Sequence, residues 1–153
     1  MSNQALLLDY LFAGELIRTR LREQVPGLAA PDSVQGIETL AQAVEKNITA
    51  PTVFVLWEGD LINTGEQGTA AGGRSQLMRQ QWTVLLAVRN ATQGDRGARN
   101  EAAGPYLSAI HKALAGWAPE GTVRPMLRAQ GRKATYTANV GLYPLTFDLP
   151  LNL

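Results

Sequence analysis

Near the start of the chain, apolar residues recur every three or four positions and predict an amphipathic helix. This helix covers about residues 4–24, and Pro26 and Gly27 end it. A connector with a short strand at Ser33–Ile37 leads to a second, shorter helix at Glu38–Asn47.

Two apolar segments in the middle of the chain predict central strands. Thr52–Trp57 is β-branched and aromatic without polar alternation, which is typical of a strand covered on both faces. Gln76–Arg89 alternates between an apolar side and a side that carries Arg and Gln. The segment between them, Glu58–Ser75, holds five glycines and few apolar residues, so we expect a long flexible loop there.

The last third of the chain predicts a helix followed by three strands. Helical spacing covers Arg96–Leu114, although Pro105 favours a helix that starts only at that residue. Two short polar strands at 122–129 and 133–139 suggest a hairpin around residues 130–132. The final strand, Gly141–Leu149, contains Pro144, which places it at an edge or a bulge.

This order of elements predicts an α+β fold. Consecutive strands without an intervening helix pair antiparallel, so we expect one mostly antiparallel sheet. The helices should pack on one face, with the Gly-rich loop between two central strands. A length of 153 residues corresponds to a single domain, residues 1–153.

Composition removes several classes of function. The chain has no cysteine and one histidine, which excludes disulfides, zinc ribbons and thiol catalysis and argues against a His-rich metal site. No apolar run is long enough for a membrane span, and Asp9 and Glu15 near the start are unlike a secretory signal. We therefore expect no cofactor, no metal and no membrane partner.

Charge is nearly balanced overall but divided along the chain. Fourteen basic and thirteen acidic residues give a net charge of +1, which makes no case for nucleic-acid binding. Residues 1–70 hold nine acids and four bases, whereas residues 71–153 hold ten bases and four acids. Either the fold interleaves the two halves, or the molecule has an acidic and a basic face suited to head-to-tail self-association.

Candidate chemistry is sparse. The glycines of residues 65–75 lack the Gly-Lys-Ser/Thr of a phosphate loop, and a strand follows them rather than a helix. Glu58 and Asp60 could share a face as a carboxylate pair, but no third acidic cluster supports them, and His111 has no relay partner. The densest group of basic residues comprises Arg124, Arg128, Arg132 and Lys133. Basic residues gathered in this way also line nucleic-acid-binding grooves.

Four stretches, in order, resemble the tail terminator (tail completion) proteins of long-tailed bacteriophages. They are the apolar strand after a proline at 50–56, the strand after the Gly-rich loop at 81–89, the helix at 102–119 and the closing strand at 141–148. The family has no signature motif, so no functional residue can be carried over position by position.

The resemblance implies a structural protein without an active site, located at the head-proximal end of the virion tail. Such α+β subunits assemble in the host cytoplasm as a six-membered ring on the tail tube. The ring stops tube polymerisation and presents a surface to the head-completion or neck connector protein. The partners implied are therefore further copies of the chain, the tail tube protein and the connector.

Charged residues in and beyond the Gly-rich loop are our candidates for interface contacts. They are Glu58, Asp60, Glu66, Arg74, Arg79, Arg89, Arg124, Arg128 and Arg132. Three alternatives stay open at this point: another neck, head–tail joining or baseplate component, a small nucleic-acid-binding module, and an enzyme that uses Glu58, Asp60 or His111.

Overall fold

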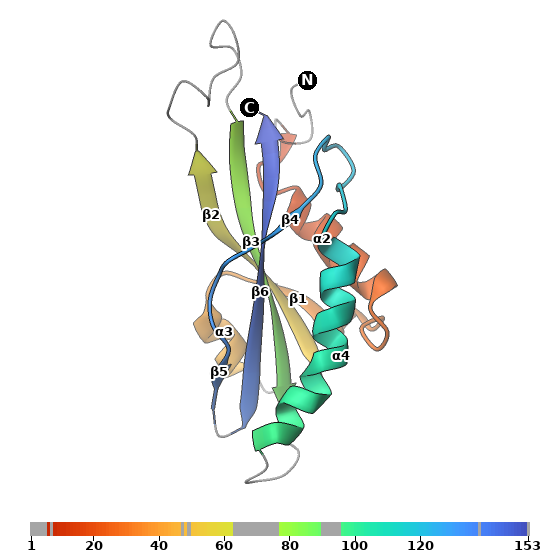
Figure 1. Cartoon of the computed structure of the whole chain (residues 1–153), viewed down its shortest axis with the longest axis vertical. Helices are drawn as coiled ribbons and strands as arrows, with labels where there is room; N and C mark the ends of the chain where they lie inside the picture. Colours follow the sequence, from red (N-terminus) through yellow and green to blue (C-terminus); the bar gives the residue numbers. More distant parts are fainter. Residues whose placement is uncertain are drawn as a thin grey trace, which may run out of the picture.

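A mixed six-stranded sheet forms the centre of the computed structural model, which describes residues 6, 8–46, 48, 50–62, 77–89, 96–137 and 139–152 (Figure 1). The strands are β1 (Val34–Ile37), β2 (Thr52–Ile62), β3 (Leu77–Arg89), β4 (Leu127–Ala129), β5 (Thr135–Tyr136) and β6 (Val140–Asn152). The helices are α2 (Ala13–Gln24), α3 (Leu40–Glu45) and α4 (Arg96–Leu114), with a 3-10 turn at Pro31–Ser33.

The strands follow the order β1-β2-β3-β6-β4, and β5 also pairs with β6. β1 is parallel to β2, and every other pair among the described strands is antiparallel. The predicted α+β class with a mostly antiparallel sheet is therefore confirmed.

The predicted N-terminal helix is shorter than its apolar pattern suggested. α2 begins at Ala13, and a turn over Asp9–Phe12 comes before it. The Asp9 carboxylate accepts a hydrogen bond from the Leu11 amide (3.0 Å), and the Asp9 carbonyl accepts one from the Phe12 amide (3.2 Å). Aspartate competes for backbone groups in this way, so the turn replaces the helix there. Residues 6 and 8 are helical, and residues 4, 5 and 7 of the predicted helix lie outside the described residues.

The two long helices pack on one face of the twisted sheet, as predicted (Figure 1). Ile17 and Leu21 of α2 meet Ile110 and Leu114 of α4 in the main core, where all four side chains are fully buried. The even-numbered residues of β3 face this core and include Met78, Trp82, Val84, Leu86 and Val88.

A second, smaller core lies on the opposite face. Phe54, Leu85, Ala87 and Leu142 alternate with residues of the main core and pack against Ala43 of α3. The expectation that Thr52–Trp57 is covered on both faces is thus confirmed for Phe54 and its neighbours. The prediction that the helices pack on one face is therefore wrong for α3, which covers this second face.

The predicted loop at Glu58–Ser75 is wrong over its first five residues. β2 continues to Ile62 and pairs with β3 throughout, with a bulge between Trp57 and Gly59. Gly59 has a φ of 122°, which suits glycine at such a bulge. The rest of the predicted loop lies outside the described residues.

α4 spans the full Arg96–Leu114, so a helix that starts at Pro105 is wrong. Pro105 lacks the backbone N–H that would bond to the carbonyl of Glu101, but Glu101 is exposed, so its carbonyl can bind water instead. Burial of Ala103 and Ile110 against the sheet favours the continuous helix.

The predicted hairpin between two short polar strands is also wrong. β4 and β5 do not pair with each other, because each pairs with β6. β6 is consequently flanked by strands on both sides rather than at an edge. Pro144 lies opposite the break between β4 and β5. No strand among the described residues pairs with it on that side, so the sheet loses no hydrogen bond there although proline lacks a backbone N–H.

Candidate functional site

The sheet face that carries α3 changes from apolar to polar along the strands. Beyond Leu85, the Thr83 and Thr146 hydroxyls hydrogen bond at 3.1 Å, and both side chains are buried. Further along, Asp148 accepts a hydrogen bond from Gln81 Nε2 (3.2 Å) and lies 3.7 Å from Arg79 Nη1. We call these residues, with Glu58 and Arg132, the polar face.

The segment between β4 and β5 passes over this polar face (Figure 1). Gly131 lies so close to Thr146 that an added Cβ would meet its Oγ1 at 1.9 Å. The segment therefore requires glycine at this position, and it carries the next residue, Arg132, toward β2.

Arg132 binds Glu58 through two nitrogens of its guanidinium group. Nε donates to Oε1 at 2.8 Å and Nη2 donates to Oε2 at 2.9 Å. Hydrogen bonding by the Arg132 guanidinium holds the pKa of Glu58 below its usual value of 4.5, and the same bond raises the pKa of Arg132. An acid from the acidic half of the chain, residues 1–70, thus pairs within the fold with a base from the basic half, residues 71–153.

On the other face, Asp60 is held by two aromatic side chains. It accepts hydrogen bonds from the Tyr10 hydroxyl and from Trp57 Nε1, the latter at 3.2 Å. The two rings meet edge to face at 6.2 Å, and Gln80 Nε2 donates to the Tyr10 carbonyl at 2.7 Å. The hydrogen bond to Asp60 raises the pKa of Tyr10 to about 12.

Apolar side chains are exposed around the same end of β2. Trp57 (38% exposed) and Ile62 (48%) lie on the face of Asp60, whereas Leu61 (49%) lies on the polar face. Leu8, two residues before Tyr10, is 90% exposed. Large apolar side chains exposed close together commonly mark an interaction site. The sequence predicted that Trp57 is buried and gave no role to Tyr10. Both depend on contacts that are distant in sequence: the exposure of Trp57 depends on which strands flank β2, and Tyr10 binds Asp60, fifty residues away.

The basic cluster is partly engaged within the molecule. Arg128 Nη1 donates to the Thr146 carbonyl at 2.9 Å, and its guanidinium lies 5.8 Å from the Phe147 ring centre. Arg132 pairs with Glu58, whereas Arg124 and Lys133 are exposed. Half of the proposed nucleic-acid groove therefore serves the fold itself.

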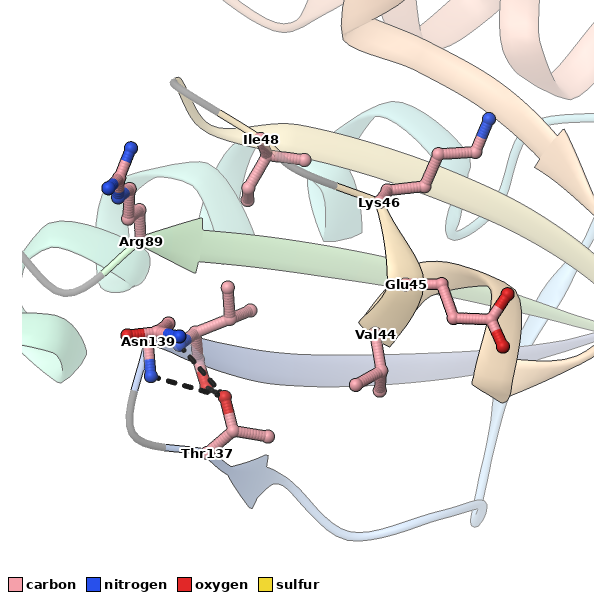
Figure 2. Close-up of a pocket in the computed structure, with 8 residues that line it drawn as sticks. Val44, Glu45, Lys46, Ile48, Arg89, Thr137 and Asn139 are labelled. Atoms are coloured by element: carbon pink, nitrogen blue, oxygen red, sulfur yellow. Dashed lines mark hydrogen bonds between the residues drawn. The ribbon is translucent and has the colours of Figure 1, made fainter.

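Arg89 lies far from these groups, in a cleft of about 430 Å³. Figure 2 shows that its lining residues come from α3 and the turn after it, from the end of β3 and from the turn before β6. In that turn the Thr137 hydroxyl accepts hydrogen bonds from the amides of Asn139 (3.3 Å) and Val140 (3.0 Å). Arg79 and Arg89 are ten residues apart on one strand, or about 33 Å, so they belong to different surfaces.

The carboxylate pair suggested by the sequence does not form. The bulge between Trp57 and Gly59 shifts the alternation, so Glu58 and Asp60 point to opposite faces of β2. His111 is exposed on α4, with its ring 6.4 Å from that of Phe147. Of the interface candidates, Glu66 and Arg74 lie outside the described residues.

Two further searches of the described part of the chain bear on function. It contains no group of three or more His, Cys, Asp or Glu side chains that could hold a metal ion. None of its helices combines the length and apolar character needed to cross a membrane.

These observations describe an α+β fold with a polar region and exposed apolar side chains on a mixed sheet. A family model described as phage tail terminator protein matches residues 7–152. The chain belongs to this family and is a structural protein of the bacteriophage tail that associates with other tail proteins. A comparison with curated proteins found no match.

Proposed function

We propose that six copies of this chain form a ring on the head-proximal end of the tail tube. The ring stops further tube polymerisation and presents its other side to the head-completion or neck connector protein. Assembly takes place in the host cytoplasm before the head joins. The family match over residues 7–152 carries this proposal.

The surfaces of the subunit support an assembly role rather than a catalytic one. The carboxylates of Glu58 and Asp60 are both held by hydrogen bonds to neighbouring side chains, on opposite faces of β2. Exposed Trp57, Leu61 and Ile62 occupy the end of β2, which suits burial against another protein. Contacts through such a surface require shape and charge but no chemical step.

Growth of tail tubes in vitro tests the proposal. Purified tail tube protein, polymerised alone and with this protein, should give long tubes in the first case and short tubes of bounded length in the second. Averaged images should show added density with six-fold symmetry at one tube end. Tubes of unchanged length, with the protein bound at their ends, would instead favour a head–tail joining role.

A nucleic-acid-binding role has a separate test. Exposed Arg124 and Lys133 predict at most weak binding of single strands, since Arg128 and Arg132 are engaged in the fold. A gel-shift assay at low salt should therefore show no shift at micromolar protein. A salt-dependent shift would favour the nucleic-acid alternative.

A further inference from the structure

The sheet has an unfilled position along β2. β1 pairs with β2 only over Val53–Leu56 and ends there at Ile37. β2 continues for six more residues, and all of them except the bulged Glu58 pair with β3 on one side. Within the described residues no strand covers the other side, so backbone donors and acceptors face outward there.

The opposite edge of the sheet is formed by a very short strand. β4 has three residues and pairs with β6 on one side only among the described strands. Leu127 is 50% exposed and Val123, just before it, is 74% exposed. This edge therefore offers apolar surface and the outward backbone groups of β4 itself, whereas those of Met126, just before it, bind Gly116 and Trp117.

The two edges lie at the same level along the strands. Leu127 is opposite Asp148, Asp148 is opposite Gln81 and Gln81 is opposite Gly59. At its other end, β4 is level with Leu56, where β1 stops. In a closed ring, neighbouring copies are related by a rotation without a shift along the ring axis. β4 of one copy is therefore level with the residues of β2 that directly follow Leu56 in the next copy.

Strand direction also fits. β4 is antiparallel to β6, β6 to β3 and β3 to β2, so β4 and β2 run in opposite directions. Rotation about a ring axis keeps the direction of a strand that runs along that axis. β4 would thus meet β2 of the next copy as an antiparallel neighbour, the arrangement that most of this sheet uses.

Charge on the two edges is complementary. Glu38 is exposed directly after β1, where the uncovered part of β2 begins. Exposed Arg124 comes three residues before β4 on the other edge. Opposite charges on two different edges favour a head-to-tail contact over a symmetric one.

From the level, direction and charge of these edges, we propose that β4 of one copy pairs with β2 of a second copy beyond Leu56. The contact extends the sheet from subunit to subunit and buries Leu61 and Leu127. This inference rests on the proposed ring, since it names the surfaces through which the ring closes.

Engineered cysteines test it directly, because the natural chain has none. Leu61→Cys and Leu127→Cys place thiols on the same sheet face but on opposite edges. Within one molecule they are three strand spacings apart across the sheet and two residues apart along it, or about 16 Å. A shorter bis-maleimide should join a mixture of the two variants into a covalent dimer. The double variant should give a ladder of products.

Matched controls separate this contact from random collision. Each single variant alone, and Leu127→Cys mixed with Val44→Cys, should give at least fivefold less dimer, since Val44 is 51% exposed on α3 but lies away from the edge of β2. Unfolding curves that match the natural chain show that each variant folds. Equal yields in the controls would overturn the inference.

Charge reversal gives a second measurement. Arg124→Glu on the Leu127→Cys chain should lower the dimer yield at least threefold at low salt. Adding Glu38→Lys to the Leu61→Cys chain should restore it. An unchanged yield on reversal would contradict the assigned charge pairing.

The two proposals fail in different ways. Hexamers in sedimentation without a cross-link between positions 61 and 127 would overturn this contact and leave the proposed function standing. Absence of both hexamers and cross-link up to millimolar protein would also overturn it, because the edges would then lack intrinsic affinity. A specific cross-link in a protein that leaves tube length unchanged would overturn the proposed function alone.

Discussion

The Arg132 guanidinium binds both carboxylate oxygens of Glu58, at 2.8 and 2.9 Å, across 74 residues of sequence. This pair holds the segment between β4 and β5 over the polar face of the sheet. The Glu58 side chain is 19% exposed and that of Arg132 49%, so water screens the pair only in part.

Removal of the pair should destabilise the protein modestly. We expect a coupling free energy of about 1 kcal/mol from a double-mutant cycle with Glu58→Gln and Arg132→Ala, as for a bidentate pair near the surface. Urea unfolding followed by circular dichroism measures it. Lys133→Ala is the matched control, because Lys133 is exposed next to Arg132 in the same segment, and it should change stability by less than about 0.5 kcal/mol. A coupling near zero would show that the pair does not contribute.

Acid should weaken the contribution of Glu58 to stability. Its pKa is lowered from 4.5 in the folded chain, so the stabilisation is fully present above about pH 4.5 and is lost as the pH falls through the folded pKa. The difference in unfolding free energy between the natural chain and Glu58→Gln should therefore shrink from pH 6 to pH 3. The lowered pKa of Glu15 beside Arg18 is common to both chains and cancels. A difference independent of pH would contradict the assignment.

Tyr10 should titrate later than an ordinary tyrosine. Its pKa of about 12 results first from the hydrogen bond to Asp60, so the folded state keeps the phenol proton between pH 10 and 12. The associated stability is fully present below pH 10 and is lost as the pH rises through 12. Ultraviolet absorbance of tyrosinate should show a late step that disappears in Tyr10→Phe. In Asp60→Asn the step should move toward pH 10, and a late step that persists in Tyr10→Phe would belong to another residue.

Gly131→Ala should be among the more damaging small substitutions. Its Cβ would lie 1.9 Å from Thr146 Oγ1 and 2.5 Å from Thr146 Cβ, which forces the segment off the sheet and weakens the Arg132–Glu58 pair. We expect a loss of roughly 2 kcal/mol in unfolding free energy, as for an overpacked site. Gly104→Ala is the control, because nothing lies within 4 Å of its added Cβ on α4, and it should stabilise by about 0.5–1 kcal/mol. Equal effects of the two substitutions would place the segment elsewhere.

Much of the fold followed from local pattern. The alternation of β3 predicted which residues face the main core, and helical spacing predicted α4 from Arg96 to Leu114. The continuous apolar character of Thr52–Trp57 predicted coverage on both faces, which α3 supplies at Phe54. These features depend on side chains close in sequence, and their periods are those of the elements themselves.

Other features could not be predicted because their causes are distant in sequence. β4 and β5 lack apolar patterning of their own, and the pairing with β6 is what orders them. Glu58 and Asp60 are two residues apart and would share a face in a regular strand. The bulge at Gly59 places them on opposite faces, and the sequence did not predict this bulge.

The sequence by itself determined an α+β chain without cysteine chemistry, with charge of opposite sign in its two halves and a resemblance to tail terminators that the family match confirms. Only the tertiary structure decided which charges remain available. It pairs Arg132 with Glu58 and leaves Arg124 and Lys133 exposed. The physical reason is that an ion pair depends on distance in space, and the sheet brings residues 58 and 132 together whatever their separation along the chain.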